Sequence, residues 1–421
     1  MKRLLVLGGI RAACEIVKKA KSMGIETHVT DYLENSPAKQ FADYSHMTST
    51  MDVDAVTQLC REIGIDGVFT GYIDSLLPSC QRICEKLKIP FWGDAQNIEM
   101  CVHKELFKRA CEKAGVPVVP WRKANKDNYK EILATINPPV VIKPADNSGS
   151  RGVYKCYEYS ELVKAAESAL KMSKSGELII EKLMRADSEF SLYYMIRNGH
   201  ASLSAMGDRY VNNQYKELAP IGQGMLYPSV HLNEWMVEGD PLIQRFFEQN
   251  RMRDGFVFLQ GFYEDGFYLH EIGYRLNGGF TYNIIEHFSK YNQLEELINY
   301  SLTGAMNDKN ESFDSPFFKG YGMIVTVSLR PGIIGHITGV SEIEAHPNVL
   351  HFYQLHEPGD HLGSYGTTAQ NFAFILCASE TEDGIRKAIT FIQDHLVVLN
   401  TEGQNMLNII IDPDNIVFKR R

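Results

Sequence analysis

The segment 139–153, PVVIKPADNSGSRGV, constrains this chain more than any other stretch of its sequence. It begins with an apolar, strand-like run that carries Lys143 at its end, and a loop rich in glycine and serine follows. Glycine lets a backbone approach a ligand closely, and the N–H groups and hydroxyls of such a loop can hold phosphate oxygens. Arg151 adds a rigid, positively charged donor. The segment predicts a phosphate-binding loop, with a plain hairpin turn as the alternative, and it is not a Walker A loop because Gly-Lys-Ser/Thr occurs nowhere in the chain.

Length and composition are those of a multidomain globular protein. The chain has 421 residues, which at roughly 150 residues per domain predicts about three domains. A net charge of −9 without a long basic run argues against nucleic acid as a partner, and no apolar run reaches the roughly 18 residues of a membrane span. The apolar start of the chain is interrupted by Arg11, so we interpret it as a first strand rather than a signal peptide. Eight cysteines without a paired pattern predict reduced thiols and a cytoplasmic location.

The first hundred residues alternate between strand and helix patterns. This alternation predicts a parallel, doubly wound sheet of the Rossmann type. Gly8, Gly9 and Asp31 match half of a dinucleotide-binding fingerprint, but Ala13 replaces its third glycine, so we favour a topological look-alike over NAD binding. Asp74 and Ser75 follow the third strand, where such sheets bind ligands, although a helix cap explains them equally well. The predicted strands are Leu4–Leu7, Thr27–Thr30, Gly67–Thr70 and 89–92, and the helices are 12–23, 53–62 and 76–87.

A smaller αβ unit, roughly 120–205, follows and is predicted to fold as a lid. It contains the lysine strand, a helix over Tyr159–Met172, a strand over 178–181 and a β pair around the Asn198-Gly199 turn. Next come a helix over 238–250, a hairpin of Gly255–Tyr263 with 267–272, and a helix over 292–304. After about residue 310 the chain becomes β-rich and ends with an amphipathic helix over Glu382–His395.

The hairpin predicts a metal site. Gln260 and Glu271 fall on neighbouring strands joined by the turn Glu264-Asp265-Gly266, so their side chains can converge on one Mg²⁺ ion that bridges phosphates. Glu271 follows the apolar run Phe267-Tyr268-Leu269, where a half-buried carboxylate without a partner is costly.

These motifs together resemble the ATP-grasp superfamily. The run EKLM…SEF, residues 181–190, resembles the adenine hinge and the ribose-binding acid of that family, and 260–275 is similar to its metal hairpin. The resemblance covers residues 3 to about 305; the rest resembles only loosely the closing subdomain of amino-acid ligases. It implies an α/β ATP-grasp fold with a Rossmann-like domain (1–100), an ATP-grasp domain (101–305, lid about 120–205) and a β-rich C-terminal α+β subdomain (306–421).

The resemblance also implies a role for each matching residue. Lys104 and Lys143 would hold phosphates, Glu271 would be the main Mg²⁺ ligand beside Gln260, and Arg275 would steady the carboxylate and the transferring phosphoryl group. Lys143 and Arg275 are therefore the implied catalytic residues. The remaining ATP contacts implied are Ser148, Gly149, Ser150, Arg151 and Gly152 over the triphosphate, Glu181, Lys182 and Leu183 at adenine, and Glu189 at the ribose.

The implied activity is ligation of a small carboxylic acid to an amine through an acyl phosphate, with ATP and Mg²⁺. Such chemistry demands positioning and charge neutralisation rather than a protein nucleophile. A homodimer is the assembly that the family commonly forms, and composition does not test it. The alternative enzyme is a bicarbonate-activating carboxylase, whose anionic substrate would be supported by clustered arginines, whereas Arg3, Arg11, Arg61 and Arg82 are dispersed.

Two residues depart from the family pattern. At the position of the family's first acidic metal ligand this chain has the neutral Gln260. Two residues after Glu271, where the family has an asparagine, it has Gly273, which has no side chain. Fewer ligand oxygens leave a degenerate ATP-binding protein without turnover as a third hypothesis. Retention of both lysines, Glu271, Arg275 and the glycine-rich loop favours activity.

Overall fold

Four β-sheets organise the part of the chain that the computed structural model describes, which is residues 1–147, 152–212, 221–306, 315–363, 368–408 and 410–418. The N-terminal residues form a parallel sheet with strand order β3-β2-β1-β4. On its central strand β1 (Arg3–Leu7), Leu4 and Val6 pack toward α1, while Leu5 and Leu7 pack toward α2 and α3. Both faces are therefore covered, as the predicted Rossmann-like sheet requires. The other elements are α1 (Ala13–Ser22), β2 (Glu26–Thr30), η1 (Pro37–Gln40), β3 (Tyr44–His46), α2 (Val53–Ile63), β4 (Gly67–Phe69), η2 (Asp74–Leu76) and α3 (Leu77–Leu87).

The prediction of a strand at 89–92 is wrong, because these residues form no strand in the structure. Pro90 lacks an N–H for a ladder, and the segment instead docks on the central sheet through Trp92. The Trp92 indole Nε1 donates to the carbonyl of Tyr274 at 3.0 Å, and the Tyr274 hydroxyl donates to the carbonyl of Trp92 at 3.0 Å. The fourth strand of the parallel sheet is β3, which the sequence did not reveal because its Tyr-Ser-His triplet is short, exposed and polar.

Asp31 serves the N-terminal domain itself. One carboxylate oxygen accepts the N–H of Gly9 at 2.7 Å, and the other accepts the N–H of Leu33 at 2.9 Å. Gly9 and Asp31, two residues of the partial dinucleotide fingerprint, therefore hydrogen-bond to each other within the domain.

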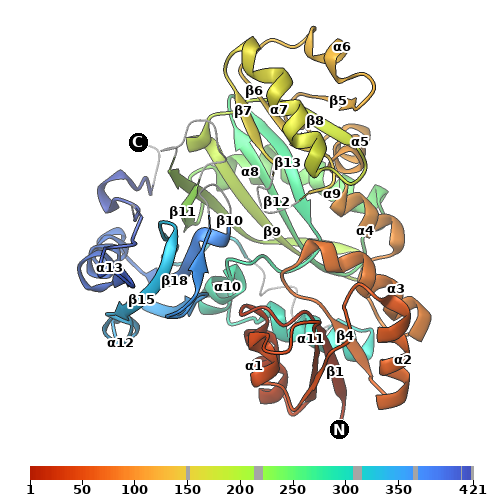
Figure 1. Cartoon of the computed structure of the whole chain (residues 1–421), viewed down its shortest axis with the longest axis vertical. Helices are drawn as coiled ribbons and strands as arrows, with labels where there is room; N and C mark the ends of the chain where they lie inside the picture. The colour runs from red at the N-terminus through yellow and green to blue at the C-terminus, as the bar shows by residue number, and fades with distance from the viewer. Residues whose placement is uncertain (148–151, 213–220, 307–314, 364–367, 409, 419–421) are drawn as a thin grey trace.

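A four-stranded antiparallel sheet, ordered β5-β8-β6-β7, forms the lid at the top of Figure 1. Helix α7 covers it with Leu162, Ala166 and Ala169, which pack on Val140 and Ile142 of β6. The β pair predicted within the lid, 190–209, pairs with β12 and β11 in the central sheet instead. The elements leading to and forming the lid are α4 (Ala95–Val102), α5 (Lys104–Ala114), β5 (Trp121–Asn125), α6 (Tyr129–Leu133), β6 (Val140–Pro144), β7 (Tyr154–Cys156), α7 (Tyr159–Met172) and β8 (Glu177–Lys182).

An eight-stranded antiparallel sheet, ordered β13-β12-β9-β10-β11-β14-β18-β16, forms the centre of the molecule. The predicted hairpin is present as β12 and β13, and the Asn198-Gly199 turn joins β9 to β10. A helix that the sequence did not predict, α10, follows β13. These elements are η3 (Ala186–Ser188), β9 (Glu189–Arg197), β10 (His200–Asn212), β11 (Ile221–Tyr227), α8 (Leu232–Glu238), α9 (Asp240–Gln249), β12 (Gly255–Tyr263), β13 (Phe267–Gly273), α10 (Thr281–Ser289) and α11 (Gln293–Thr303).

The C-terminal residues extend this sheet rather than standing apart from it. Strands β14, β18 and β16 continue it beyond β11, and a three-stranded sheet, β17-β15-β19, lies beside α13. The domain boundaries at residues 100 and 305 stay predictions. No described helix combines the length and the apolar character needed to cross a bilayer. The elements are β14 (Tyr321–Ser328), β15 (Gly332–Thr338), α12 (Val340–Glu344), β16 (Val349–Gln354), β17 (His361–Leu362), η4 (Thr368–Gln370), β18 (Asn371–Ser379), α13 (Glu382–His395), β19 (Val397–Asn400) and η5 (Pro413–Asn415).

Docking of the Trp92 segment depends on a glycine at the start of β12. Gly255 has φ +104°, and a Cβ there would lie 2.8 Å from Cδ1 of Trp92, whereas Gly199 has φ +85° and open space around its Cβ position. We expect Gly199→Ala to lower the free energy of unfolding by about 1–2 kcal/mol through backbone strain alone. Gly255→Ala should cost at least about 1 kcal/mol more, because the indole must also move. Denaturant titration of both variants checks this, and equal losses would contradict the docking.

Candidate active site

A cavity of about 420 Å³ lies between the lid sheet and the central sheet. Its lining contains most of the residues that the sequence singled out, including both phosphate lysines, the hinge, the ribose acid, the metal pair and the arginine: Lys104, Lys143, Glu181, Lys182, Leu183, Glu189, Gln260, Glu271 and Arg275. Ser148, Gly149, Ser150 and Arg151 lie outside the described residues. Gly152 has φ +78° and is not part of the lining of this cavity.

Glu181 on β8 lies buried between two lysines. Its carboxylate is 2.7 Å from Nζ of Lys143 on β6 and 2.8 Å from Nζ of Lys108 on α5. Burial alone would raise the pKa of the Glu181 carboxyl, but the two ammonium groups outweigh it and hold that pKa well below its usual value. Lys143 thus reaches the cavity already anchored, and its remaining protons are available to a second anion.

Lys104 occupies the first turn of α5 and reaches the loop that follows β6. Its ammonium donates to the carbonyl of Asn147, beside the glycine-rich segment. Burial lowers the pKa of Lys104, and the Glu271 carboxylate opposes that shift. A half-buried ammonium that faces a cavity favours an anion there, because the anion compensates for the water that burial removed.

The hinge differs in one detail from what the resemblance implies. The N–H of Lys182 donates to Pro120 O at 2.9 Å and that of Leu183 donates to Pro139 O at 3.2 Å, so both amides hold the lid together. The next residue, Met184, lines the cavity, and its N–H has no acceptor among the described residues. Met184 is therefore the backbone donor that this hinge offers to a ligand, and the motif alone did not reveal it.

Gln260 on β12 and Glu271 on β13 lie on neighbouring strands, as predicted, and a shift of register beside Gln260 makes them direct cross-strand partners. The Gln260 amide nitrogen lies 3.5 Å from Oγ of Ser191. That orientation leaves the amide oxygen free to act as a ligand beside the Glu271 carboxylate. One carboxylate and one amide oxygen fit a Mg²⁺ ion that completes its shell with water and phosphate oxygens.

Packing explains the glycine at the family asparagine position. A Cβ at Gly273 would lie 2.2 Å from Cε1 of its cross-strand partner Phe258, so the phenyl ring fills the space a side chain would need. Residue 273 therefore supplies no metal ligand, and Gln260 and Glu271 are the hairpin residues that bring side-chain oxygens to the cavity lining.

Arg275 is held by the N-terminal domain. Its guanidinium makes a two-pronged ion pair with Asp74, with Nε 2.6 Å from Oδ1 and Nη2 2.5 Å from Oδ2. The same guanidinium stacks over the Phe258 ring, 5.0 Å from its centroid. Asp74, which the sequence left open between a substrate contact and a cap, is the first residue of η2, whose N-cap is Ile73. The Asp74 carboxylate lines the cavity and orients the predicted catalytic arginine.

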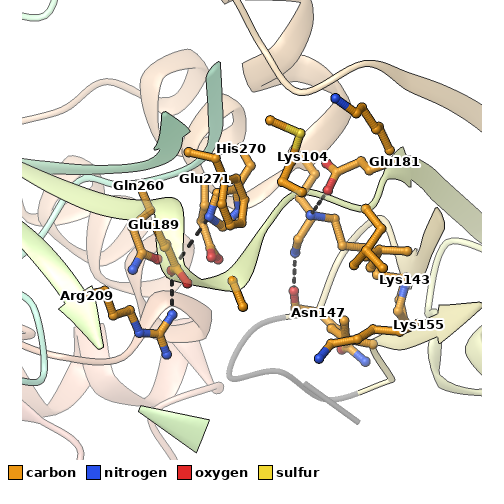
Figure 2. Close-up of a pocket in the computed structure, with 18 of the residues that line it drawn as sticks. Lys104, Lys143, Asn147, Lys155, Glu181, Glu189, Arg209, Gln260, His270 and Glu271 are labelled. Atoms are coloured by element: carbon orange, nitrogen blue, oxygen red, sulfur yellow. Dashed lines mark hydrogen bonds and ion pairs between the residues drawn. The ribbon is translucent and has the colours of Figure 1, made fainter. Parts of the chain in front are cut away.

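Three further basic residues line the cavity: Lys155, Arg209 and His270. The place of Arg209 between the lid and the core predicted that it could line a substrate pocket, whereas no sequence pattern singled out Lys155 or His270. Lys155 lies on β7 opposite Val141, and burial lowers its pKa. Arg209 on β10 pairs through Nη1 with Glu189. Figure 2 shows Arg209, His270 and Gln260 around Glu189, facing Lys104, Lys143 and Lys155 across the cavity. Lys155 and Glu181 are the cross-strand partners of Val141 on its two neighbouring strands, so the three side chains share one face of the lid sheet. This register is the signal that could have identified Lys155 as a cavity residue.

Lys108 gives a direct test of the buried charge cluster. Lys108→Met removes one partner of Glu181, and we expect a loss of roughly 2 kcal/mol in the free energy of unfolding, less than for an ion left wholly unpaired because Lys143 remains. The matched control is Lys113→Met, an exposed lysine on the same helix, which should change stability by less than about 0.5 kcal/mol. Equal effects in denaturant titrations would contradict the cluster.

Several known proteins are similar to this chain in sequence. Residues 103–202 match the family model for the ATP-binding domain of the carbamoyl-phosphate synthase L chain. The formate-dependent phosphoribosylglycinamide formyltransferase of Sulfurisphaera tokodaii is 29% identical over 195 residues, which are 45% of this chain and 49% of that protein. The 2-oxoglutarate carboxylase small subunit of Hydrogenobacter thermophilus is 29% identical over 231 residues, 50% of this chain and 46% of its own. The chain thus matches about half the length of these relatives.

Solved structures are similar over nearly the whole chain. The L-amino acid ligase from Bacillus licheniformis superposes with a TM-score of 0.79 at 16% identity, covering 95% of this chain and 99% of that one. The phosphoribosylglycinamide synthetase from Anaerococcus prevotii gives a TM-score of 0.73 at 17% identity, covering 95% and 100%. The chain therefore has the ATP-grasp fold that its motifs predicted, with residues 103–202 matching an ATP-binding domain of that superfamily.

Proposed function

We propose that this protein is an ATP-dependent ligase that joins a small carboxylic acid to an amine and releases ADP and phosphate. The observation that carries the proposal is the convergence in one cavity of two lysines, the half-buried Lys104 and the buried Lys143, with the carboxylate–amide pair of Glu271 and Gln260 and with Arg275. Cations, a hard-metal ligand pair and a planar guanidinium are the groups that phosphoryl transfer to a carboxylate needs.

The nucleotide would lie along the cavity from the hinge to the lysines. The Met184 N–H and the Lys182 carbonyl would meet the adenine, Glu189 the ribose hydroxyls, and Lys104 and Lys143 the phosphates. Glu271 and Gln260 would hold Mg²⁺, which when bound neutralises charge on the phosphate oxygens.

The reaction then follows from charge and position. A carboxylate oxygen of the acid, oriented by Arg275, attacks the γ-phosphorus, and the bond from that phosphorus to the ADP oxygen breaks. The amine next attacks the carbonyl carbon of the acyl phosphate, and phosphate leaves with the bridging oxygen. A second cavity of about 200 Å³ shares Asp74, Lys104 and Glu271 with the first and offers room for another substrate.

Bicarbonate activation is the second candidate, supported by the similarity to the 2-oxoglutarate carboxylase small subunit. Phosphate release that bicarbonate stimulates without an added acid and amine would favour it. None of the N-domain arginines lines the main cavity, since Arg3 pairs with Glu26 and Arg11 with Glu357. The carboxylate–amine ligase therefore remains the first choice.

Lys143→Ala should abolish turnover, because it removes an anchored phosphate contact and leaves Glu181 with Lys108 alone. The measurement is phosphate release from ATP and Mg²⁺ with pooled amino acids and small carboxylates. Lys164→Ala, at an exposed lysine of α7, is the control and should keep full activity. Unchanged turnover in Lys143→Ala, with a folded protein, would reject this assignment of the cavity. ATP binding without phosphate release in any pool would instead favour the third hypothesis, a degenerate ATP-binding protein without turnover.

Gln260→Glu should strengthen the metal site. A second carboxylate next to Glu271 raises the negative charge on the ligand oxygens, so half-saturating Mg²⁺ should fall by roughly tenfold or more, equivalent to about 1.4 kcal/mol per factor of ten. A Mg²⁺ titration of ATP binding checks this. An unmoved titration curve would show that the side chain of residue 260 does not face the metal.

A further inference from the structure

A β-bulge turns His270 into the cavity beside Glu271. On β13, Glu271 pairs with Gln260 and Leu269 pairs with Gly261, so His270 is the extra residue that has no partner on β12. Consecutive strand residues ordinarily point to opposite faces, and a bulge breaks that alternation. As a result, His270 and Glu271 both line the same cavity.

His270 brings an unused polar atom to a specific place. Its side chain is 14% exposed, and Nε2 is buried and has no hydrogen-bond partner among the residues that the structure describes. The imidazole ring lies against Phe262 with centroids 5.0 Å apart, and Nε2 is 4.0 Å from Oε1 of Glu189. A buried donor or acceptor without a partner costs about 1–3 kcal/mol, so an apolar side chain would serve packing at least as well.

An imidazole that carries a proton on Nε2 can donate it to a ligand oxygen. The neighbouring Glu189 carboxylate accepts from Nη1 of Arg209 and has lone pairs left.

We propose that His270 and Glu189 together hold one ribose hydroxyl of the bound nucleotide, which makes His270 a specificity-determining residue for ribonucleotides. A hydroxyl both donates and accepts, so it can donate to Oε1 of Glu189 while accepting from the Nε2–H of His270. The 4.0 Å between these atoms is too long for a direct hydrogen bond, but it admits an oxygen about 2.8 Å from each. The inference rests on the proposed function, since it assumes that the cavity binds ATP.

The test compares ATP, 2′-deoxy-ATP and 3′-deoxy-ATP. Dissociation constants of the full chain with Mg²⁺ are measured by calorimetry for the wild type, His270→Leu and His270→Gln. The wild type should prefer ATP over one of the two deoxy analogues. In His270→Leu that preference should fall by about five- to tenfold, through weaker ATP binding, with the affinity for the same analogue changed less than twofold. His270→Gln, which keeps an N–H donor, should recover part of the preference.

A purely structural role for His270 predicts a different pattern. Loss of packing would weaken the binding of all three nucleotides by the same factor and leave the ratios of their dissociation constants unchanged. Either that result or no effect at all overturns the inference. If the wild type binds ATP and only the ratios fail to change, the inference falls and the proposed function stands. Failure of the wild type to bind ATP would overturn both.

Discussion

The buried carboxylate of Glu181 ties the lid to the rest of the ATP-binding region. It lies between a lysine of its own sheet, Lys143, and a lysine of α5, Lys108, so one anion fixes three elements at the back of the cavity. Removing any of the three ions would leave an unpaired or half-paired charge in a region of low polarity. The arrangement also presents the Lys143 ammonium to the cavity at a fixed place, which an exposed lysine on a flexible stem would not do.

A second set of contacts fixes the part of the cavity lining that contains Arg275 and Asp74. Arg275 is clamped by Asp74, and the Trp92 and Tyr274 side chains exchange hydrogen bonds with each other's backbone. Both contacts join the Rossmann-like domain to the β13 hairpin and the segment after it. The N-terminal domain thus positions the arginine and bounds the space in which an acid would meet it.

Much of this fold follows from local pattern. The Glu264-Asp265-Gly266 turn joins β12 to β13 as predicted, and α7 and α13 have the predicted bounds. The direct pairing of Gln260 with Glu271 additionally needs the bulge at His270, which the sequence did not reveal. The features that sequence missed depend on contacts that no local pattern contains. Asp74 and Arg275 are 201 residues apart, and Lys108 is a charged residue that only the assembled lid makes fully buried. A bulge turns His270 inward against the strand alternation that sequence reasoning relies on.

An oxygen label shows whether the cavity activates a carboxylate by phosphoryl transfer. Amino acids and small acids whose carboxyl oxygens carry ¹⁸O are incubated with the protein, ATP, Mg²⁺ and the unlabelled amine pool. An acyl phosphate requires that one carboxyl oxygen leaves with phosphate, so mass spectrometry should find one ¹⁸O atom in the released phosphate. Turnover that yields unlabelled phosphate, or that places the label in AMP, would exclude activation through an acyl phosphate.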